Sequence, residues 1–440
     1  MPTLELPPEL WQHIFSSLCF HCTRSATRDP VPDQRLSWVS FFPSKAPLTA
    51  LASLSSVSRM FNALITPLLY HLPITAKTGL LLRTLVDRPD LARHVRELHH
   101  AMWCSNRPER RDAYPPAFIE LYIRNVEWLL AHHDDVLVPG GWDHQRVSNP
   151  GYLDDHILDS TVIALCPKLT VLSIESCDHN VLVHLAPGSL PHLTAASVTH
   201  GDLESAMGFD RITFLAAAVP NLTTLHLRYA GTNGDEDKTF FPVFPNVINL
   251  RLEESVITSD SWGRVFDSFP RLELFSYSSG GVTVGHNASN TRQVQDAILQ
   301  HKPNLKRLCI DMAHEVFDGT PLEDRTWKPA LAQMEHLEHF ETDMTCLFHP
   351  ETDILSEYLV RILPPSLRFL RVACWRGSLD TQLRQAFLRL AEAAPERFPE
   401  LETVVLAGPE SEEMSVVSLE WKNAWEGARV KCLVTGHIAL

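Results

Sequence analysis

The sequence predicts an α/β protein in which a small amino-terminal helical hairpin precedes a horseshoe-shaped solenoid. Three observations lead to this fold class. A unit close to Pro-x-Leu-x-x-Leu-x-Leu occurs nine times, helix-forming stretches lie between its copies, and two apolar helical stretches precede them. At 440 residues and 45% hydrophobic content, the chain is long enough to bury the core of such an array.

The first helix is expected to begin at the amino-terminal prolines. Proline at the first helical position costs no backbone hydrogen bond, and the carboxylate of Glu9 would face the positive end of the helix dipole. Leu10, Ile14 and Leu18 then recur at four-residue steps, which places them on one face of a helix. Because so short a helix cannot bury that face by itself, a second helix is expected to pack against it.

The second helical stretch covers residues 48–64, where apolar residues recur every three or four positions before Pro67. Residues 19–47 separate the two stretches and contain four prolines, which is typical of a loop. We therefore predict one helical domain over residues 1–75, into which residues 19–47 are inserted as a loop.

Short segments of this domain resemble the two halves of an F-box. They are Leu6-Pro7-Pro8-Glu9-Leu10 with Ile14-Phe15 and Leu18, and then Leu54-Ser55-Ser56-Val57-Ser58-Arg59-Met60-Phe61. Residues 63–71 resemble the segment that often follows this box in fungal members of the family. The resemblance covers residues 4–71, and the long insertion departs from the family pattern.

The resemblance implies that the hairpin binds a Skp-type adaptor and, through it, a cullin–RING ubiquitin ligase. A different interpretation is that the helices only cap the solenoid behind them. The positions that match the adaptor contacts of the family are Leu6, Pro7, Leu10, Ile14, Phe15, Leu18, Leu54, Val57 and Phe61.

The rest of the chain contains the repeated unit. Its central apolar residue lies at positions 169, 193, 222, 247, 272, 305, 337, 367 and 401, at spacings of 24 to 34 residues. These spacings lie within the range of leucine-rich repeats or a few residues above it. Proline would end a helix, and the alternating leucines would form a strand that only stacked neighbours can bury. The pattern predicts a horseshoe solenoid of leucine-rich repeats, and a doubly wound sheet is the alternative.

The solenoid is predicted over residues 161–440, with a carboxy-terminal cap that contains Trp421 and Trp425. Residues 76–160 fit the repeat least well and are predicted to form irregular first repeats, with a strand at 91–98 and helical residues after them. The helices predicted within the chain are residues 117–132, 159–165, 211–219, 261–269, 291–301 and 381–394.

A substrate is expected on the concave face, where the strand residues that flank the buried ones would point. Arg228 and Arg251 favour an acidic or phosphorylated segment, whereas Glu341 and Asp343 favour a basic one. The alternative for each side chain is a solvated face with internal charge pairing. The candidate substrate-binding residues are His226, Arg228, Arg251, Glu253, Asp311, Glu341, Arg371 and Trp375.

Charge and composition argue against several classes of partner. The net charge of -15 opposes a phosphate backbone, so nucleic acid is not expected. The sequence has no apolar span of about 18 residues and no signal-peptide pattern, so neither a membrane helix nor secretion is expected. Nine scattered cysteines are typical of reduced thiols in the cytoplasm or the nucleus.

Metal and catalytic motifs are weak. Cys19-Phe20-His21-Cys22 has the spacing of half a zinc site, but no second close pair of Cys or His follows it, so loop thiols and no metal are predicted. His132-His133-Asp134-Asp135 is interpreted as a polar helix end. The sequence has no nucleophile elbow, phosphate loop, zinc-protease motif or dinucleotide fingerprint, so neither an enzyme nor a cofactor is expected.

Together the resemblance and the repeats identify a chain similar to the F-box leucine-rich-repeat proteins. The expected function is that of a substrate-recognition adaptor in a Skp–cullin–F-box type ubiquitin ligase, where the repeats hold a substrate protein that the sequence does not name. The alternatives are a protein-binding scaffold with no role in ubiquitination and an enzyme, such as a hydrolase, within residues 100–160.

Overall fold

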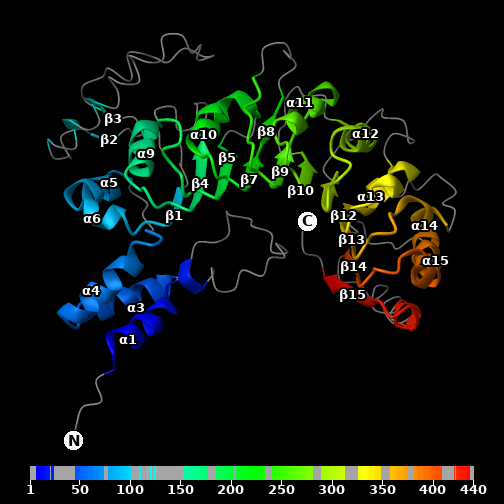
Figure 1. The fold of residues 1–440 in the computed structure, drawn as a ribbon, viewed down its shortest axis with the longest axis horizontal. Coiled ribbons are helices and arrows are strands. Elements are labelled where there is room, and N and C mark those ends of the chain that lie inside the picture. The colour runs from blue at the N-terminus through cyan, green and yellow to red at the C-terminus, as the bar shows by residue number, and fades with distance from the viewer. Residues whose placement is uncertain are drawn as a thin grey trace, which may run out of the picture. The chain divides into compact units, whose positions relative to one another are not determined.

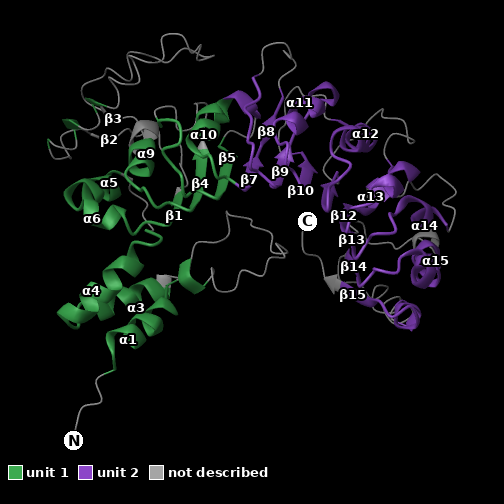
Figure 2. Ribbon diagram, in the orientation of Figure 1, with its two compact units in different colours: residues 1–201, 211–222 green, residues 202–210, 223–440 purple. Residues whose placement is uncertain are grey.

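A computed structural model of the protein describes a large part of the chain. The described residues are 6–19, 21–23, 45–73, 78–100, 109–110, 116, 119–120, 123–124, 152–153, 155–176, 185–201, 205–232, 240–280, 289–312, 326–347, 357–373, 381–408, 421 and 423–436. The chain divides into two compact units, one of residues 1–201 with 211–222 and the other of residues 202–210 with 223–440 (Figure 2). The domain ranges that were inferred from the sequence stay a prediction.

Among the described residues, the helices of the amino-terminal hairpin include α1 (Pro8–Ser16), α3 (Lys45–Ser55) and α4 (Arg59–Leu69). The start of α1 is as predicted, with a proline in its first position and Glu9 in its first turn. The predicted second stretch is split in two, because Ser58 begins a new helix: its hydroxyl accepts the backbone N–H of Phe61 at 3.1 Å. Most of the predicted insertion, residues 24–44, lies outside the described residues.

A small hydrophobic core holds the hairpin together. Its aromatic centre consists of Trp11, Phe15 and Phe61, whose ring centroids lie 4.8 to 5.6 Å apart, a range that suits aromatic pairs. The fully buried members of this core are Phe15, Cys19, Leu51, Ile65 and Leu68. The core therefore joins the end of α1 to α3 and α4.

The remainder of the first unit begins with α5 (Thr78–Asp87) and α6 (Pro89–Ala92). The strand predicted at 91–98 is wrong in position, because its first residues end α6 and the strand itself is β1 (Glu97–His100). Most of the predicted helix 117–132 lies outside the described residues. The other elements of this unit are β2 (Glu109–Arg110), β3 (Tyr152–Leu153), α9 (Asp155–Ala164), β4 (Val171–Ser176), β5 (Ala195–His200) and α10 (Thr213–Ala218), which the 3-10 helix Phe209–Ile212 precedes.

The second unit alternates strands with helices. Its strands are β6 (Met207–Gly208), β7 (Thr224–Arg228), β8 (Ala230–Gly231), β9 (Asn249–Ser255), β10 (Leu274–Ser279), β11 (Arg307–Asp311), β12 (His339–Asp343), β13 (Phe369–Ala373), β14 (Thr403–Gly408) and β15 (Lys431–Gly436). Its helices are α11 (Trp262–Asp267), α12 (Thr291–His301), α13 (Met344–Leu347), α14 (Tyr358–Ile362) and α15 (Thr381–Arg397), with 3-10 helices at Ser259–Ser261 and Pro329–Gln333. The helices predicted at 159–165, 211–219, 261–269, 291–301 and 381–394 are confirmed, with differences of zero to four residues at each end.

One large parallel sheet dominates the structure (Figure 1). It has 11 strands in the order β1-β4-β5-β7-β9-β10-β11-β12-β13-β14-β15. The predicted horseshoe solenoid of leucine-rich repeats is therefore wrong, and the protein is an α/β fold built on a single 11-stranded, all-parallel sheet with helices. The strand order follows the chain without the reversal that a doubly wound sheet requires. Strands that alternate with helices, each strand preceded by a buried leucine, occur in more than one α/β architecture. The sequence pattern therefore did not distinguish between these architectures.

The strands begin at regular points in the sequence. Each of the nine predicted apolar residues, from Leu169 to Leu401, lies two positions before a strand of this sheet. One carbonyl oxygen there accepts two backbone N–H groups from the next strand: the oxygen of Thr223 accepts those of Ile248 and Asn249 at 3.0 and 3.1 Å. The same arrangement recurs at the entrance of successive strands, and it fixes their register.

Within the described residues, no helix has both the length and the apolar character needed to cross a membrane.

Candidate functional site

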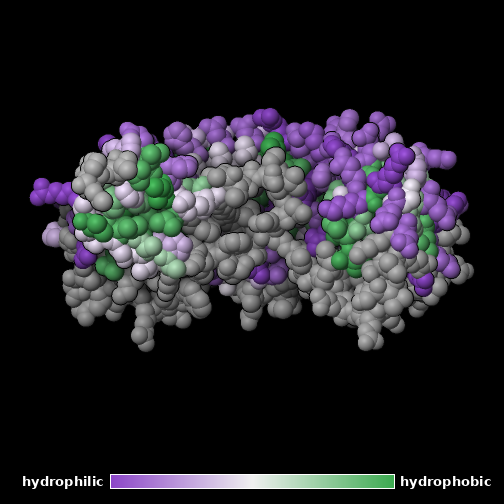
Figure 3. Space-filling view, turned by 90° about the horizontal axis from the view of Figure 1, so that it is seen from below, coloured by the Kyte–Doolittle hydropathy of each residue, from purple (hydrophilic) through white to green (hydrophobic). Residues whose placement is uncertain are grey.

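The hairpin presents a row of exposed apolar side chains. Large hydrophobic side chains normally lie inside a protein, so a contiguous exposed group marks a candidate contact surface. Figure 3 shows apolar residues gathered over the helices of the hairpin, at the left of the view. We call this surface the hairpin face; it consists of Leu6, Leu10, Ile14, Val57 and Met60.

The exposure of Leu10 and Ile14 follows from the way that apolar residues are spaced along α1. Residues four apart lie on the same side of a helix, so Trp11 and Phe15 share the side that packs against Phe61. Leu10 and Ile14 lie one position earlier, and their side chains are exposed. Helix α1 thus has one aromatic side in the core and an adjacent aliphatic side on the surface.

The nine residues predicted to contact an adaptor separate into two groups. Leu6, Pro7, Leu10, Ile14 and Val57 are exposed, as a contact requires. The prediction for Phe15 needs correction, since its side chain is 1% exposed and fills the hairpin core. Leu18, Leu54 and Phe61 are partly buried against the same core. Met60, three residues after Val57 in the chain, was not among the predicted contacts and is also exposed.

Four of the eight predicted substrate-binding residues share one register row of the sheet. The row runs across six strands, from β7 to β13, through directly paired residues. It consists of His226, Arg251, Ser276, Cys309, Glu341 and Arg371. The sheet therefore brings together four of the eight predicted positions, although the chain separates them by up to 145 residues, which is 371 minus 226.

Charged side chains of this row pair with neighbours within the molecule. Glu253 lies 2.8 Å from Nε2 of His226 and 3.2 Å from the guanidinium of Arg251. Glu341 lies between Arg307 and Arg371, with the second contact at 3.3 Å. These distances are those of ion pairs and charge-assisted hydrogen bonds.

The other predicted positions differ in their surroundings. Arg228 binds Glu254 at 3.0 Å, and Asp311 is buried. Trp375 lies outside the described residues. The internal pairing considered from the sequence thus accounts for the described arginines at these positions.

The pair of His226 and Glu253 predicts a pH dependence of stability. Burial lowers the pKa of His226 below its ordinary value of 6.5, although the Glu253 carboxylate acts in the opposite direction. The imidazole is therefore neutral at pH 7, with its Nε2 atom 2.8 Å from a carboxylate oxygen of Glu253. Because the unfolded chain binds a proton at higher pH than the folded chain does, stability is lost as the pH falls below 6.5, by at most about 1.4 kcal/mol per pH unit for this group.

Replacing His226 with glutamine tests this dependence. We expect the thermal unfolding midpoint of His226→Gln to fall less steeply between pH 6.5 and pH 5 than that of the wild-type protein, as followed by circular dichroism. The control is His301→Gln, since His301 is half-buried at the end of α12 and lies outside the row. Equal slopes for the wild-type protein and His226→Gln would contradict the assignment.

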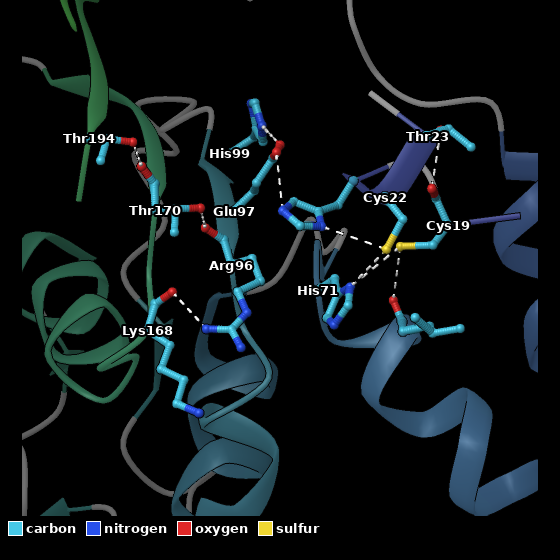
Figure 4. Close-up of polar contacts among 12 residues, drawn as sticks. Cys19, Cys22, Thr23, His71, Arg96, Glu97, His99, Lys168, Thr170 and Thr194 are labelled. Carbon is cyan, nitrogen blue, oxygen red and sulfur yellow. Dashed lines mark hydrogen bonds and ion pairs between the residues drawn. The ribbon is translucent and has the colours of Figure 1, made fainter. Parts of the chain in front are cut away.

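A second cluster lies where α1 ends. Among the described residues, one group of Cys, His, Asp or Glu side chains is close enough to hold a metal ion: Cys19, His21, Cys22 and His71 (Figure 4). The sequence indicated the first three through their spacing, but it gave no reason to join them to His71. That histidine follows α4 and is 49 residues from Cys22, so only the folded hairpin shows the fourth ligand.

We compared the chain with protein-family models and with curated proteins. No family model matches the chain, and no curated protein matches it either. The resemblance to F-box proteins therefore stays a prediction from the residues of the hairpin.

Proposed function

We propose that this protein is a substrate-recognition adaptor of a Skp–cullin–F-box type ubiquitin ligase, and that its hairpin face binds the Skp-type adaptor. The observation that supports the proposal is the exposure of Leu6, Leu10, Ile14 and Val57, which are positions where the hairpin resembles an F-box. Burying each such side chain would stabilise a complex by about 1.5–3 kcal/mol. A partner with an apolar groove would thus be bound strongly.

In this proposal the protein is not an enzyme. The hairpin connects it to the cullin–RING ligase, the α/β sheet holds the substrate protein, and other subunits carry out the transfer of ubiquitin. The net charge of -15 favours a protein substrate over nucleic acid. The place of action is the cytoplasm, the nucleus or both, where the ligase and reduced thiols occur together.

Binding of full-length variants to a purified Skp-type adaptor tests the hairpin face. We expect Ile14→Ala to weaken binding about 10- to 100-fold, because it removes most of one buried aliphatic contact. Ile14→Asp is expected to abolish binding, since it would bury an unpaired carboxylate. The dissociation constants are measured by isothermal titration calorimetry.

Leu80 provides a matched control for these variants. Its side chain is 44% exposed and that of Ile14 is 43% exposed, but Leu80 belongs to α5. Leu80→Ala is expected to bind like the wild-type protein, and circular dichroism checks that all variants are folded. The proposal fails if the wild-type chain does not bind a Skp-type adaptor, or if Ile14→Ala binds as tightly as Leu80→Ala does.

The lifetime of bound proteins separates the adaptor from a plain protein-binding scaffold. Partners are identified by affinity purification with mass spectrometry, and their half-lives are compared in cells with and without the chain. At least one partner should accumulate when the chain is deleted and when Ile14→Asp replaces it. Unchanged turnover of every partner would favour the scaffold.

A further inference from the structure

We propose that Cys19, His21, Cys22 and His71 form a structural zinc site that joins the hairpin to the first strand of the sheet. This site goes beyond the proposed function and does not depend on adaptor binding. Two thiolates with two imidazoles are one of the ligand sets that structural zinc prefers. Two residues separate the cysteines, which follow the end of α1, and His71 lies just after α4.

The spacing of the donor atoms fits a tetrahedral zinc ion. Sγ of Cys22 lies 3.5 Å from Nδ1 of His71 and 3.9 Å from Nδ1 of His21, and Sγ of Cys19 lies 3.7 Å from Nδ1 of His71. Zinc bonds of about 2.3 Å to sulfur and about 2.0–2.1 Å to nitrogen place tetrahedral S and N ligands about 3.6 Å apart. All four donor atoms lie within 4.8 Å of one another, so little rearrangement is needed.

A buried carboxylate lies behind one of the histidines. Nδ1 of His21 lies 3.9 Å from Sγ of Cys22, and its Nε2 lies 3.9 Å from Oε1 of Glu97. The other carboxylate oxygen of Glu97 lies 3.3 Å from Nε2 of His99. Histidines that bind zinc through one nitrogen commonly donate the other N–H to a carboxylate, which orients the ring and strengthens the ligand. Glu97 belongs to β1 and is buried, so it reaches the cluster from outside the hairpin.

The backbone brings these parts together. The carbonyl oxygen of His71 accepts the N–H groups of Arg96 and Glu97 at 3.0 and 2.9 Å. The segment after α4 is therefore held against the start of β1, which fixes the position of the His71 side chain. Thr23 is bonded to the carbonyl oxygen of Cys19 through its backbone N–H at 3.0 Å and its hydroxyl at 3.1 Å, which keeps both cysteines on one helical turn.

Zinc binding would need neutral imidazoles and thiolates at the four positions. A bound zinc ion would deprotonate the two thiols outright, because coordination by a divalent cation more than offsets the cost of a buried thiolate.

Elemental analysis of the purified full-length protein tests the site. We expect about one zinc ion per chain, and we expect Cys22→Ser and His71→Asn to lose at least nine-tenths of it after dialysis. Cys432→Ser and His94→Asn are matched controls, because both residues are half-buried and neither belongs to the cluster. They should keep the zinc content of the wild-type protein.

Two further measurements keep the test independent of folding defects in the variants. Cobalt(II) added to metal-free wild-type protein should produce the visible and sulfur charge-transfer bands of a tetrahedral site. Glu97→Gln should still bind one zinc ion at saturation, but about 10- to 100-fold more weakly in competition with a chromophoric chelator. That loss of affinity without loss of stoichiometry identifies Glu97 as a positioning residue.

Two outcomes would overturn the proposal. One is wild-type protein that has both thiols reduced, as titration with a thiol reagent shows, and yet holds neither zinc nor added cobalt. The other is zinc that remains bound in both Cys22→Ser and His71→Asn. Adaptor binding is measured separately with Ile14→Ala, whose side chain lies outside the cluster, so failure of one proposal leaves the other standing.

Discussion

Replacing Glu341 with alanine is expected to destabilise the second unit by about 3–5 kcal/mol. The Glu341 side chain is 4% exposed and lies between two arginines, Arg307 and Arg371, which are also largely buried. Removal of the carboxylate would leave two cations with poor access to water and without this counter-charge. Breaking a buried pair in this way costs far more than the pair contributes relative to apolar residues.

Urea unfolding followed by circular dichroism measures this loss, with Glu402→Ala as the control. Glu402 also pairs with an arginine, Arg368, but both side chains are about half exposed. Exposed pairs contribute about 0–1 kcal/mol because water and salt screen them. If the two variants lost the same stability, the buried triad would not hold β11, β12 and β13 together as described.

Replacing Trp262 with alanine is the second large effect, and we again expect a loss of about 3–5 kcal/mol. Trp262 is fully buried at the start of α11 and packs on Phe266, Phe275 and Tyr277, with ring centroids 5.0 to 6.0 Å away. Its indole N–H also donates to the hydroxyl of Ser289 at 2.8 Å. Alanine would leave a cavity and remove that hydrogen bond.

The control for Trp262 is Phe240→Ala, because Phe240 is 59% exposed. It should change the free energy of unfolding by less than about 0.5 kcal/mol, as is usual for surface substitutions. Trp262→Phe retains much of the aromatic volume and should recover part of the loss. A Trp262→Ala variant as stable as Phe240→Ala would mean that α11 is not anchored by this side chain.

The strands were the part of the fold most open to sequence reasoning. An apolar residue, leucine in all but one case, lies two positions before each of nine strands of the large sheet and marks where the chain enters it, because that side chain is buried as the strand begins. The overall architecture could not be predicted in the same way, because alternating strands and helices are compatible with more than one arrangement of a sheet. The break at Ser58 was also missed, because apolar periodicity continues across it and only the cap of α4 shows the new helix.

The candidate sites, like the fold, could be predicted only in part from the sequence. The apolar residues of α1 could be read from the sequence, but spacing alone does not say that Phe15 faces the core while Ile14 faces outward. The pairing of His71 with Cys19 and Cys22 depends on how the hairpin closes, over separations of 52 and 49 residues. A local sequence motif does not show which distant residues meet when the hairpin folds.

The order of strands in the sheet has a consequence for synthesis on the ribosome. Within the 11-stranded sheet, each strand from β9 to β15 pairs with the strand of that sheet made just before it, across chain separations such as 25 residues from Thr223 to Ile248 and 34 residues from Arg368 to Glu402. When one of these strands emerges from the ribosome, the strand with which it pairs has already been synthesised. Short separations of this kind lower the entropic cost of pairing, so the sheet can grow in the direction of translation.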